Sequence, residues 1–203
     1  MSTFINSFWK KAASFITMSS NSVSSSWSPT QITNSGSTLE WTVSNGVNIA
    51  KTAVDDPTFD FSGNTGTADI LVEKIDGFTE LDINELNITE LYLSSNTAFT
   101  FLNCSYNQIL ELDVSTNTEL ISLYCQANAI SVLDVSTNTE LIYLSCYDNN
   151  QDPSITDQIF IDLDANGKSN GALKTRNNRT SASDGARANL ITKGWEITDN
   201  YTS

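Results

Sequence analysis

The feature that most constrains this sequence is a repeat of 21 residues between Leu81 and Asn149. Short apolar motifs begin at equivalent positions of successive units: LDI at Leu81, LNC at Leu102, LYC at Leu123 and LSC at Leu144. Further columns of matching residues are Ile88, Ile109 and Ile130; Leu91, Leu112 and Leu133; Leu93, Val114 and Val135; Asn107, Asn128 and Asn149; and Asn96, Asn117 and Asn138. A fixed period in the twenties predicts stacked units, none of which can bury its apolar face alone.

Each short motif has the alternation of a β-strand. In Leu123-Tyr124-Cys125 the outer two side chains are predicted to point inward and the middle one outward. Stacked units would pair these strands in parallel, about 4.8 Å apart. The Asn128 column is the polar exception, because a buried amide must find hydrogen-bond partners in its own and the adjacent unit. The repeated LDV predicts a second, short extended segment on the other side.

The segment 120–130 reads LISLYCQANAI, which has the pattern LxxLxCxxNxI with Cys at one Leu position. It resembles the leucine-rich-repeat family, in particular the short-repeat proteins of bacterial surfaces (internalin-like) and of some bacteriophages. We therefore predict an α/β fold: a short leucine-rich-repeat solenoid at 77–152, with an N-terminal β cap and a C-terminal αβαβ cap. Caps are expected because the units contact only their neighbours.

Residues 1–18 predict an amphipathic helix, because apolar residues recur at helical spacing. Lys10 and Lys11 follow its first apolar residues, so it is a poor secretory signal. The helix could pack on its own domain or on another copy, dock to a larger assembly, or lie on a membrane surface. We identify its apolar stripe as a candidate assembly anchor: Phe4, Ile5, Phe8 and Trp9.

Two segments separate this helix from the repeats. Residues 19–29 are rich in Ser and predict a linker. Residues 30–76 predict a small antiparallel β unit, in which Asn45-Gly46 indicates a hairpin turn. The strands expected there are 39–43, 47–50, 58–61 and 68–74.

Residues 153–203 are expected to close the other end of the solenoid. A helix is predicted with Ser154 as its N-cap and Gly167 as its stop. Its buried stripe would be Ile155, Ile159 and Leu163. A strand at 172–175, a helix at 183–193 and a strand at 195–198 complete the αβαβ tail.

The formal net charge of −14 is unevenly distributed. From Ile75 to Gly167 there are 15 Asp and Glu and no Lys or Arg, and the sign reverses after Gly167. Such an acidic solenoid disfavours nucleic acid, whose affinity comes from phosphate neutralisation. It could favour cations or a basic partner, although a solvated acidic surface is the commoner meaning of such a charge pattern.

The sequence offers little catalytic chemistry. Without His there is no Ser/His/Asp or Cys/His arrangement, and Cys104, Cys125 and Cys146 are expected to be buried free thiols. Residues 162–167 match the first half of a calcium loop, but Leu173 stands where the bidentate Glu is needed. Asp55, Asp56, Asp60 and Asp69 could also collect calcium, although such carboxylates are usually solvated. We predict no enzyme, no cofactor and no metal site.

The alternation of the strands predicts one candidate binding surface. Its tyrosines would give contact area at low entropy cost, although exposed Tyr on a sheet also reflects strand propensity alone. The outward residues are Phe101, Asn103, Ser105, Ser122, Tyr124, Gln126, Tyr143, Ser145 and Tyr147.

These features favour a non-enzymatic interaction protein in a larger assembly. The anchor-like helix and the resemblance to phage repeat proteins favour a bacteriophage virion component. The alternative is a bacterial cell-surface adhesin or receptor-like module that binds host protein or glycan. In both cases the expected partners are proteins of the assembly or a host receptor, together with further copies of this chain in a homo-oligomer.

Overall fold

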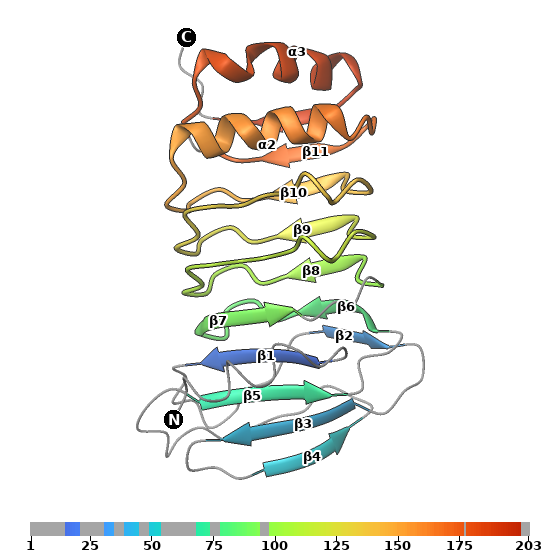
Figure 1. Cartoon of the computed structure of the whole chain (residues 1–203), viewed down its shortest axis with the longest axis vertical. Helices are drawn as coiled ribbons and strands as arrows, with labels where there is room; N and C mark the ends of the chain where they lie inside the picture. Colours follow the sequence, from blue (N-terminus) through green and yellow to red (C-terminus); the bar gives the residue numbers. More distant parts are fainter. Residues whose placement is uncertain are drawn as a thin grey trace.

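The computed structural model describes residues 15–20, 31–34, 39–44, 49–53, 68–73, 78–93, 98–176 and 178–199. Its elements form one elongated stack of strands, with two helices beside the C-terminal end (Figure 1). Two sheets make up this stack, and the first repeat contributes a strand to each.

The repeats build a seven-stranded sheet in the order β12-β11-β10-β9-β8-β6-β2. Its strands are β2 (Gln31–Asn34), β6 (Phe78–Asp82), β8 (Phe101–Asn103), β9 (Ser122–Tyr124), β10 (Tyr143–Ser145), β11 (Ala172–Lys174) and β12 (Glu196–Thr198). All neighbours are parallel except β2, which pairs antiparallel with β6. The 21-residue register is confirmed, since Leu81, Leu102, Leu123 and Leu144 are successive partners.

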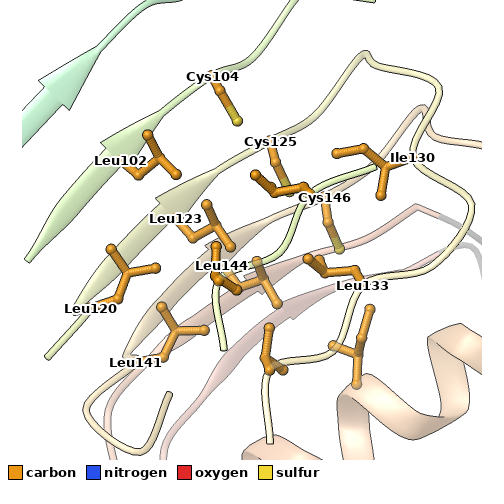
Figure 2. Close-up of a cluster of buried hydrophobic side chains, with 14 of the residues drawn as sticks. Leu102, Cys104, Leu120, Leu123, Cys125, Ile130, Leu133, Leu141, Leu144 and Cys146 are labelled. Carbon is orange, nitrogen blue, oxygen red and sulfur yellow. The ribbon is translucent and has the colours of Figure 1, made fainter. Parts of the chain in front are cut away.

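The inward side chains form one continuous hydrophobic core. Leu123 and Cys125 of one unit lie between their equivalents in the units on either side (Figure 2). We call the chain that leads from the turn after one strand back to the next strand the return segment, for example residues 129–142 between β9 and β10. Ile130, Leu133 and Leu141 lie in this return segment and complete the same cluster. Each fully buried Leu or Ile contributes about 1.5–3 kcal/mol to stability, so the stacking of units supplies most of the driving force.

The return segments keep the predicted alternation without forming strands. Leu112 and Val114 are buried while Asp113 is exposed, and the next unit repeats this pattern. Residues 112–114 and 133–135 form no hydrogen-bonded strand, whereas the equivalent residues of the first unit belong to β7 (Ile88–Leu93), which pairs with β1 (Phe15–Ser20). The chain turns immediately after residue 114, where the Asn117 amide donates to the Val114 carbonyl at 3.0 Å.

The second sheet is antiparallel and has the order β4-β3-β5-β1-β7. Its strands are β1 (Phe15–Ser20), β3 (Leu39–Ser44), β4 (Ile49–Ala53), β5 (Ala68–Glu73) and β7 (Ile88–Leu93). The first repeat joins the two sheets, because β6 lies in the parallel sheet and β7 pairs with β1. The sequence did not predict β2, whereas β7 contains Leu91 and Leu93, at the position of the second extended segment that the LDV columns predict.

The N-terminal helix prediction is wrong for residues 15–18, which belong to β1. This strand pairs with β5 on one side and β7 on the other. Aromatic and β-branched residues in its sequence FITMSS suit a paired strand, and Ser19 and Ser20 are part of it rather than of a linker. Residues 1–14 with the anchor residues Phe4, Ile5, Phe8 and Trp9, the linker residues 21–29, the predicted turn at 45–46 and the predicted strand 58–61 lie outside the described residues.

A ladder of asparagine amides runs through the turns that follow the strands. Asn128 accepts a hydrogen bond from the Ile109 amide (3.0 Å) and donates to the carbonyls of Cys104 (3.0 Å) and Cys125 (3.2 Å). Asn107 makes the equivalent bonds one unit earlier, and Asn149 one unit later. The predicted role of this column, to bond backbone groups of its own and the adjacent unit, is confirmed.

A second ladder lies in the return segments. Asn117 and Asn138 are fully buried, and Asn138 donates to the carbonyls of Val114 (3.0 Å) and Asn117 (2.9 Å). Asn166 then donates to the carbonyls of Val135 (3.5 Å) and Asn138 (3.3 Å). The ladder thus extends into the residue that ends the following helix, beyond the part of the sequence where the repeat is visible.

Two helices flank the C-terminal strands. The helix α2 (Pro153–Ala165) buries Ile159 and Leu163 as predicted, with Ile155 packed at the edge of the core. Its N-cap is Asp152 rather than Ser154: the Asp152 carboxylate accepts from the Ser154 amide, and Pro at the first helical position suits this start. A short 3₁₀ turn, η1 (Ser181–Ser183), leads into α3 (Asp184–Thr192).

The turn after each of the strands β6, β8, β9 and β10 contains one residue whose φ is positive, in the left-handed region. These residues recur every 21 positions and none is glycine: Glu85, Tyr106, Ala127 and Asp148. In three of the four turns, the ladder asparagine follows directly. A left-handed residue other than glycine costs about 1 kcal/mol or more, so the repeat contains recurrent strain that its hydrogen bonds offset.

We expect Asn128→Ala to lower the free energy of unfolding by about 1–3 kcal/mol, because buried backbone groups lose their partners. Asn103→Ala should lower the free energy of unfolding less, because the Asn103 side chain bonds groups at the sheet surface. It donates to the Asp82 carboxylate and accepts from the amide and the hydroxyl of Ser105. Urea unfolding of the two variants measures the difference. Equal midpoints would contradict a structural role for the ladder.

We expect Ala127→Gly to stabilise the protein by about 0.5–1 kcal/mol, because glycine adopts a φ of 53° without steric cost. The matched control is Ala129→Gly in the same turn, where φ is negative and the added chain entropy should destabilise instead. Thermal unfolding of both variants tests the prediction. A loss of stability in Ala127→Gly as large as in the control would refute it.

Candidate functional site

The outward side of the parallel sheet presents a continuous surface, which we call the outer sheet face. It carries the outward side chains of β6, β8, β9, β10 and β11 and of the turns after β10 and β11. Its members are Glu80, Asp82, Phe101, Asn103, Ser122, Tyr124, Tyr143, Tyr147, Lys174 and Arg176. The inward neighbours Leu102, Leu123 and Leu144 are buried, so the core fixes where these outward side chains stand.

Three aromatic rings from consecutive repeats form a row across this face. The Phe101 ring centroid lies 5.5 Å from that of Tyr124, and the rings are tilted by 46°. Tyr124 stacks on Tyr143 at 4.5 Å with an interplanar angle of 27°. Pairs at such distances gain about 0.5–1.5 kcal/mol beyond their buried area. The row is therefore held in place before any partner arrives.

A second aromatic pair lies past the ends of the strands. The hydroxyl groups of Tyr106 and Tyr147 are 3.2 Å apart and share a hydrogen bond. This bond, with a smaller effect of burial, raises the pKa of the Tyr147 phenol. The guanidinium of Arg176 lies 4.8 Å from the centre of the Tyr147 ring.

Different strands of the outer sheet face carry opposite charges. Glu80 and Asp82 lie on β6, where the Asn103 side chain donates to the Asp82 carboxylate at 3.0 Å. On β11, the Lys174 ammonium lies 5.5 Å from the centre of the Tyr143 ring. Lys174 and Arg176 are both exposed, and the exposed Glu196 follows on β12. The aromatic rings thus lie between carboxylates on β6 and a mixture of charges at β11 and β12.

The structure places the nine residues predicted for this surface unequally. Six of them are half-buried on the face: Phe101, Asn103, Ser122, Tyr124, Tyr143 and Tyr147. Three were predicted to be outward but are buried: Ser105, Gln126 and Ser145. Whether the surface binds a partner is not tested by burial and stays a proposal.

Those three corrections have two physical causes. Ser145 is in a strand, but its small side chain stands between the larger partners Tyr124 and Lys174. Ser105 and Gln126 lie past the strands, where the chain curls over the first asparagine ladder and their carbonyls accept from Asn107 and Asn128. The strand alternation does not extend into this turn.

Sequence reasoning did not place Lys174 on this face. The step from Ser145 to Lys174 exceeds 21 residues because α2 is inserted, so the repeat period could not place β11 in register. The alternation within Ala172-Leu173-Lys174 carried the signal, since an inward Leu173 requires an outward Lys174. Leu173 is indeed fully buried and pairs with Leu144.

Other cations of the C-terminal segment face carboxylates. Arg179 contacts Asp184 at 2.6 Å, and Arg187 contacts Asp199 at 2.7 Å. Burial alone would raise the pKa of the Asp199 carboxyl, but the hydrogen bond and charge of Arg187 and the charge of Arg179 together lower it. Lys168 pairs with Glu140 and Lys193 with Asp164.

The acidic side chains of the half calcium loop at 162–167 form hydrogen bonds and an ion pair with other residues of this chain. The Gln158 amide donates to Asp162 at 2.8 Å, and Asp164 pairs with Lys193, while Asn166 belongs to the second ladder. Within the described ranges, no three His, Cys, Asp or Glu side chains are grouped to hold a metal ion, and no helix has the length and hydrophobicity to span a membrane. Asp55, Asp56 and Asp60 lie outside those ranges.

The three cysteines stack at one position of successive repeats and are free and fully buried. Burial raises the pKa of Cys104 and of Cys146 to about 12, and raises that of Cys125 well above its ordinary value. Reactive thiols instead have a lowered pKa and some exposure. The column is therefore part of the core rather than a reactive centre.

Comparisons with known proteins identify two solved structures from Listeria monocytogenes. No family model and no curated protein matches the chain. The functional domain of InlJ, described as including a cysteine ladder, shares 33% identity over 44% of this chain and 20% of its own, with a TM-score of 0.38. An internalin, InlF, shares 22% identity over 62% of this chain and 35% of its own, with a TM-score of 0.48.

The chain thus corresponds to a minor part of each Listeria protein. The internalin-like part of the resemblance agrees with these neighbours, and its bacteriophage part is not supported. Neither neighbour is described as a virion protein. Both TM-scores are below 0.5.

We expect all three cysteines to react slowly with iodoacetamide in the folded protein, because the thiolate is nearly absent below pH 9 and the sulfur atoms are buried. Labelling should become fast in denaturant. Mass spectrometry of the modified peptides gives the rate at each site. Rapid labelling of all three without denaturant would contradict the buried column.

Proposed function

We propose that this chain is a non-enzymatic protein-binding module of the leucine-rich-repeat type, and that its outer sheet face contacts the partner. The observation that carries the proposal is the row of Phe101, Tyr124 and Tyr143, whose rings are stacked on a sheet surface and remain only half-buried. Aromatic side chains of this kind commonly dominate binding energy in protein interfaces.

The rigidity of the scaffold supports this role. Binding costs free energy when side chains and loops must be ordered, and a surface that is already ordered avoids part of that cost. Tyr124 stands between its neighbours in the row, and Leu123 and Cys125 on either side of it are buried in the core. The face can therefore meet a partner without rearrangement.

The chemistry of the face favours binding over catalysis. Its phenols and amides can donate and accept hydrogen bonds, and its rings offer apolar area. The nearest thiols are the buried cysteines, whose raised pKa keeps them protonated. A flat sheet surface also leaves a substrate exposed to water, whereas catalytic sites are usually concave.

We place the module at a bacterial cell surface rather than in a virion. The virion prediction depended on an N-terminal amphipathic helix, whose residues 15–18 instead belong to the strand β1, and on a resemblance to phage repeat proteins that no comparison supports. The anchor residues Phe4, Ile5, Phe8 and Trp9, homo-oligomer formation and membrane contact stay predictions. A host receptor protein is the partner that we favour, with glycan as the competing ligand.

The test is selection of binding peptides. A random peptide library displayed on phage is panned against the whole chain, and each recovered peptide is then measured against three variants. We expect Tyr124→Ala and Tyr143→Ala to weaken most peptides about tenfold or more, a loss of about 1.4 kcal/mol. Biolayer interferometry gives the affinities.

The matched control is Val132→Ala. Val132 is 59% exposed and lies in the return segment of the Tyr124 repeat, outside the strands. Its truncation should leave the same peptides unaffected, and melting curves should show that all variants fold. Peptides that bind both Tyr variants as tightly as the original chain would refute the proposal.

A further inference from the structure

We propose that the partner docks a basic amphipathic α-helix along the aromatic row, with the helix axis across the strands and parallel to the long axis of the stack (Figure 1). This inference rests on the proposed function and adds the shape and chemistry of the partner segment. It begins from the spacing of Phe101, Tyr124 and Tyr143, whose successive ring centroids are 5.5 and 4.5 Å apart.

The spacing of the three rings matches the pitch of an α-helix. A helix advances about 5.4 Å in one turn, and residues three or four positions apart lie on the same side of it. A helix along the row therefore places one side chain beside each ring. An extended segment on the same path repeats its side chains on one face about every 6.6 Å, so it would be about 3 Å out of step at the third ring.

The width of the outer sheet face also fits one helix. The strands β8, β9 and β10 have three residues each, which span about 10 Å at about 3.3 Å per residue. A helix with its side chains is about 10–12 Å across. One helix laid across these strands therefore covers them from the edge where they begin to the turns that follow them.

The two edges of this path differ in polarity. Ile121 and Ile142 stand directly before β9 and β10, and both are exposed. They are neighbours, because the Ile142 amide donates to the Ile121 carbonyl at 3.0 Å. At the opposite edge, the turns after the strands carry the exposed Glu85 and Tyr106. A helix that fits both edges is amphipathic, with apolar residues towards Ile121 and Ile142 and polar residues towards the turns.

The charge near Phe101 selects basic residues on the helix. Asp82 lies on β6, which pairs with the strand of Phe101, and Glu85 lies in the turn after β6. Glu85 forms no salt bridge with any residue that the structure describes. Lys or Arg at this end of the helix would meet both carboxylates, whereas the strands beyond Tyr143 carry Lys174 and Glu196 and favour neither sign. The unequal charge fixes which end of the helix lies at Phe101.

The experiment compares two display libraries of equal size, both panned against the whole chain. In one library the variable residues cover the outer side of a helix in a stable three-helix scaffold. In the other they alternate along an exposed strand of a stable β-hairpin scaffold. Binders that need Tyr124 should come from the helix library, with apolar residues three or four and seven positions apart.

Double-mutant cycles between the rings and the selected helix test the alignment. Phe101→Ala and Tyr143→Ala should each weaken a binder about tenfold. The loss from Phe101→Ala should disappear when the helix residue at one end of the apolar stripe is changed to Ala. The loss from Tyr143→Ala should disappear only when the residue seven positions away is changed, and the crossed combinations should be additive.

The charge of the helix is tested by Glu85→Gln, with Glu111→Gln as the matched control. Both changes keep the size of the side chain, and Glu111 is an exposed carboxylate in a return segment. Helix binders with Lys or Arg near Phe101 should lose about threefold in affinity for Glu85→Gln, and this loss should shrink as salt is raised. Glu111→Gln should leave their affinity unchanged. Melting curves of every variant separate lost binding from lost folding.

The outcomes distinguish the two proposals. Binders that need Tyr124 but come from the hairpin library, or that show no coupling in register with Phe101 and Tyr143, would overturn the docked helix and leave the proposed function intact. A helix library without any binder that needs Tyr124 would overturn the docked helix as well. Equal effects of Glu85→Gln and Glu111→Gln would overturn its basic character. Binders from both libraries that are insensitive to Tyr124→Ala would overturn both proposals.

Discussion

The buried asparagine amides are the interaction on which the rest of this structure depends. Stacked repeats must turn the chain inside the molecule, and each turn leaves backbone groups that water cannot reach. A single amide such as that of Asn128 serves several of them in two adjacent units at once. The apolar columns supply the energy of stacking, but apolar contacts alone would tolerate sliding between units. The amides accept only one register.

The fixed register has a consequence for the outer sheet face. Because Leu102, Leu123 and Leu144 are held above one another, the side chains beside them are also aligned from unit to unit. Variation at these outward positions then has little effect on the core, and Phe101, Tyr124 and Tyr143 can form a row without disturbing it. The left-handed residues, such as Ala127, are the cost of this arrangement, and the hydrogen bonds of the turn outweigh it.

The sequence predicted the repeated part well because its evidence is redundant. The Leu columns, the Cys column and the Asn128 column agree on the same period, so one misreading could not shift the register. The N-terminal part had no such support: residues 15–18 are compatible with the apolar spacing of a helix, and only pairing with β5 and β7 makes them a strand. Burial of Ser145 likewise depends on its cross-strand neighbours, which alternation along one strand does not reveal. The position of Lys174 could not be predicted from the repeat period, because α2 is inserted between β10 and β11.

The insertion of α2 lies where the charge of the sequence changes, because Lys and Arg appear only after Gly167 in the second half of the chain. In the preceding units the return segment follows the same course each time, and its exposed positions include the carboxylates of Asp113 and Asp134. In the C-terminal units α2 and α3 take the place of the return segment, and two of their carboxylates form ion pairs: Asp184 with Arg179 and Asp164 with Lys193. The second ladder keeps the inserted unit in line, because Asn166 takes the place that Asn138 has one repeat earlier. The sheet therefore continues without interruption past α2, and Lys174 on β11 is brought beside Tyr143. The amides of the second ladder thus help to determine which side chains the surface presents side by side.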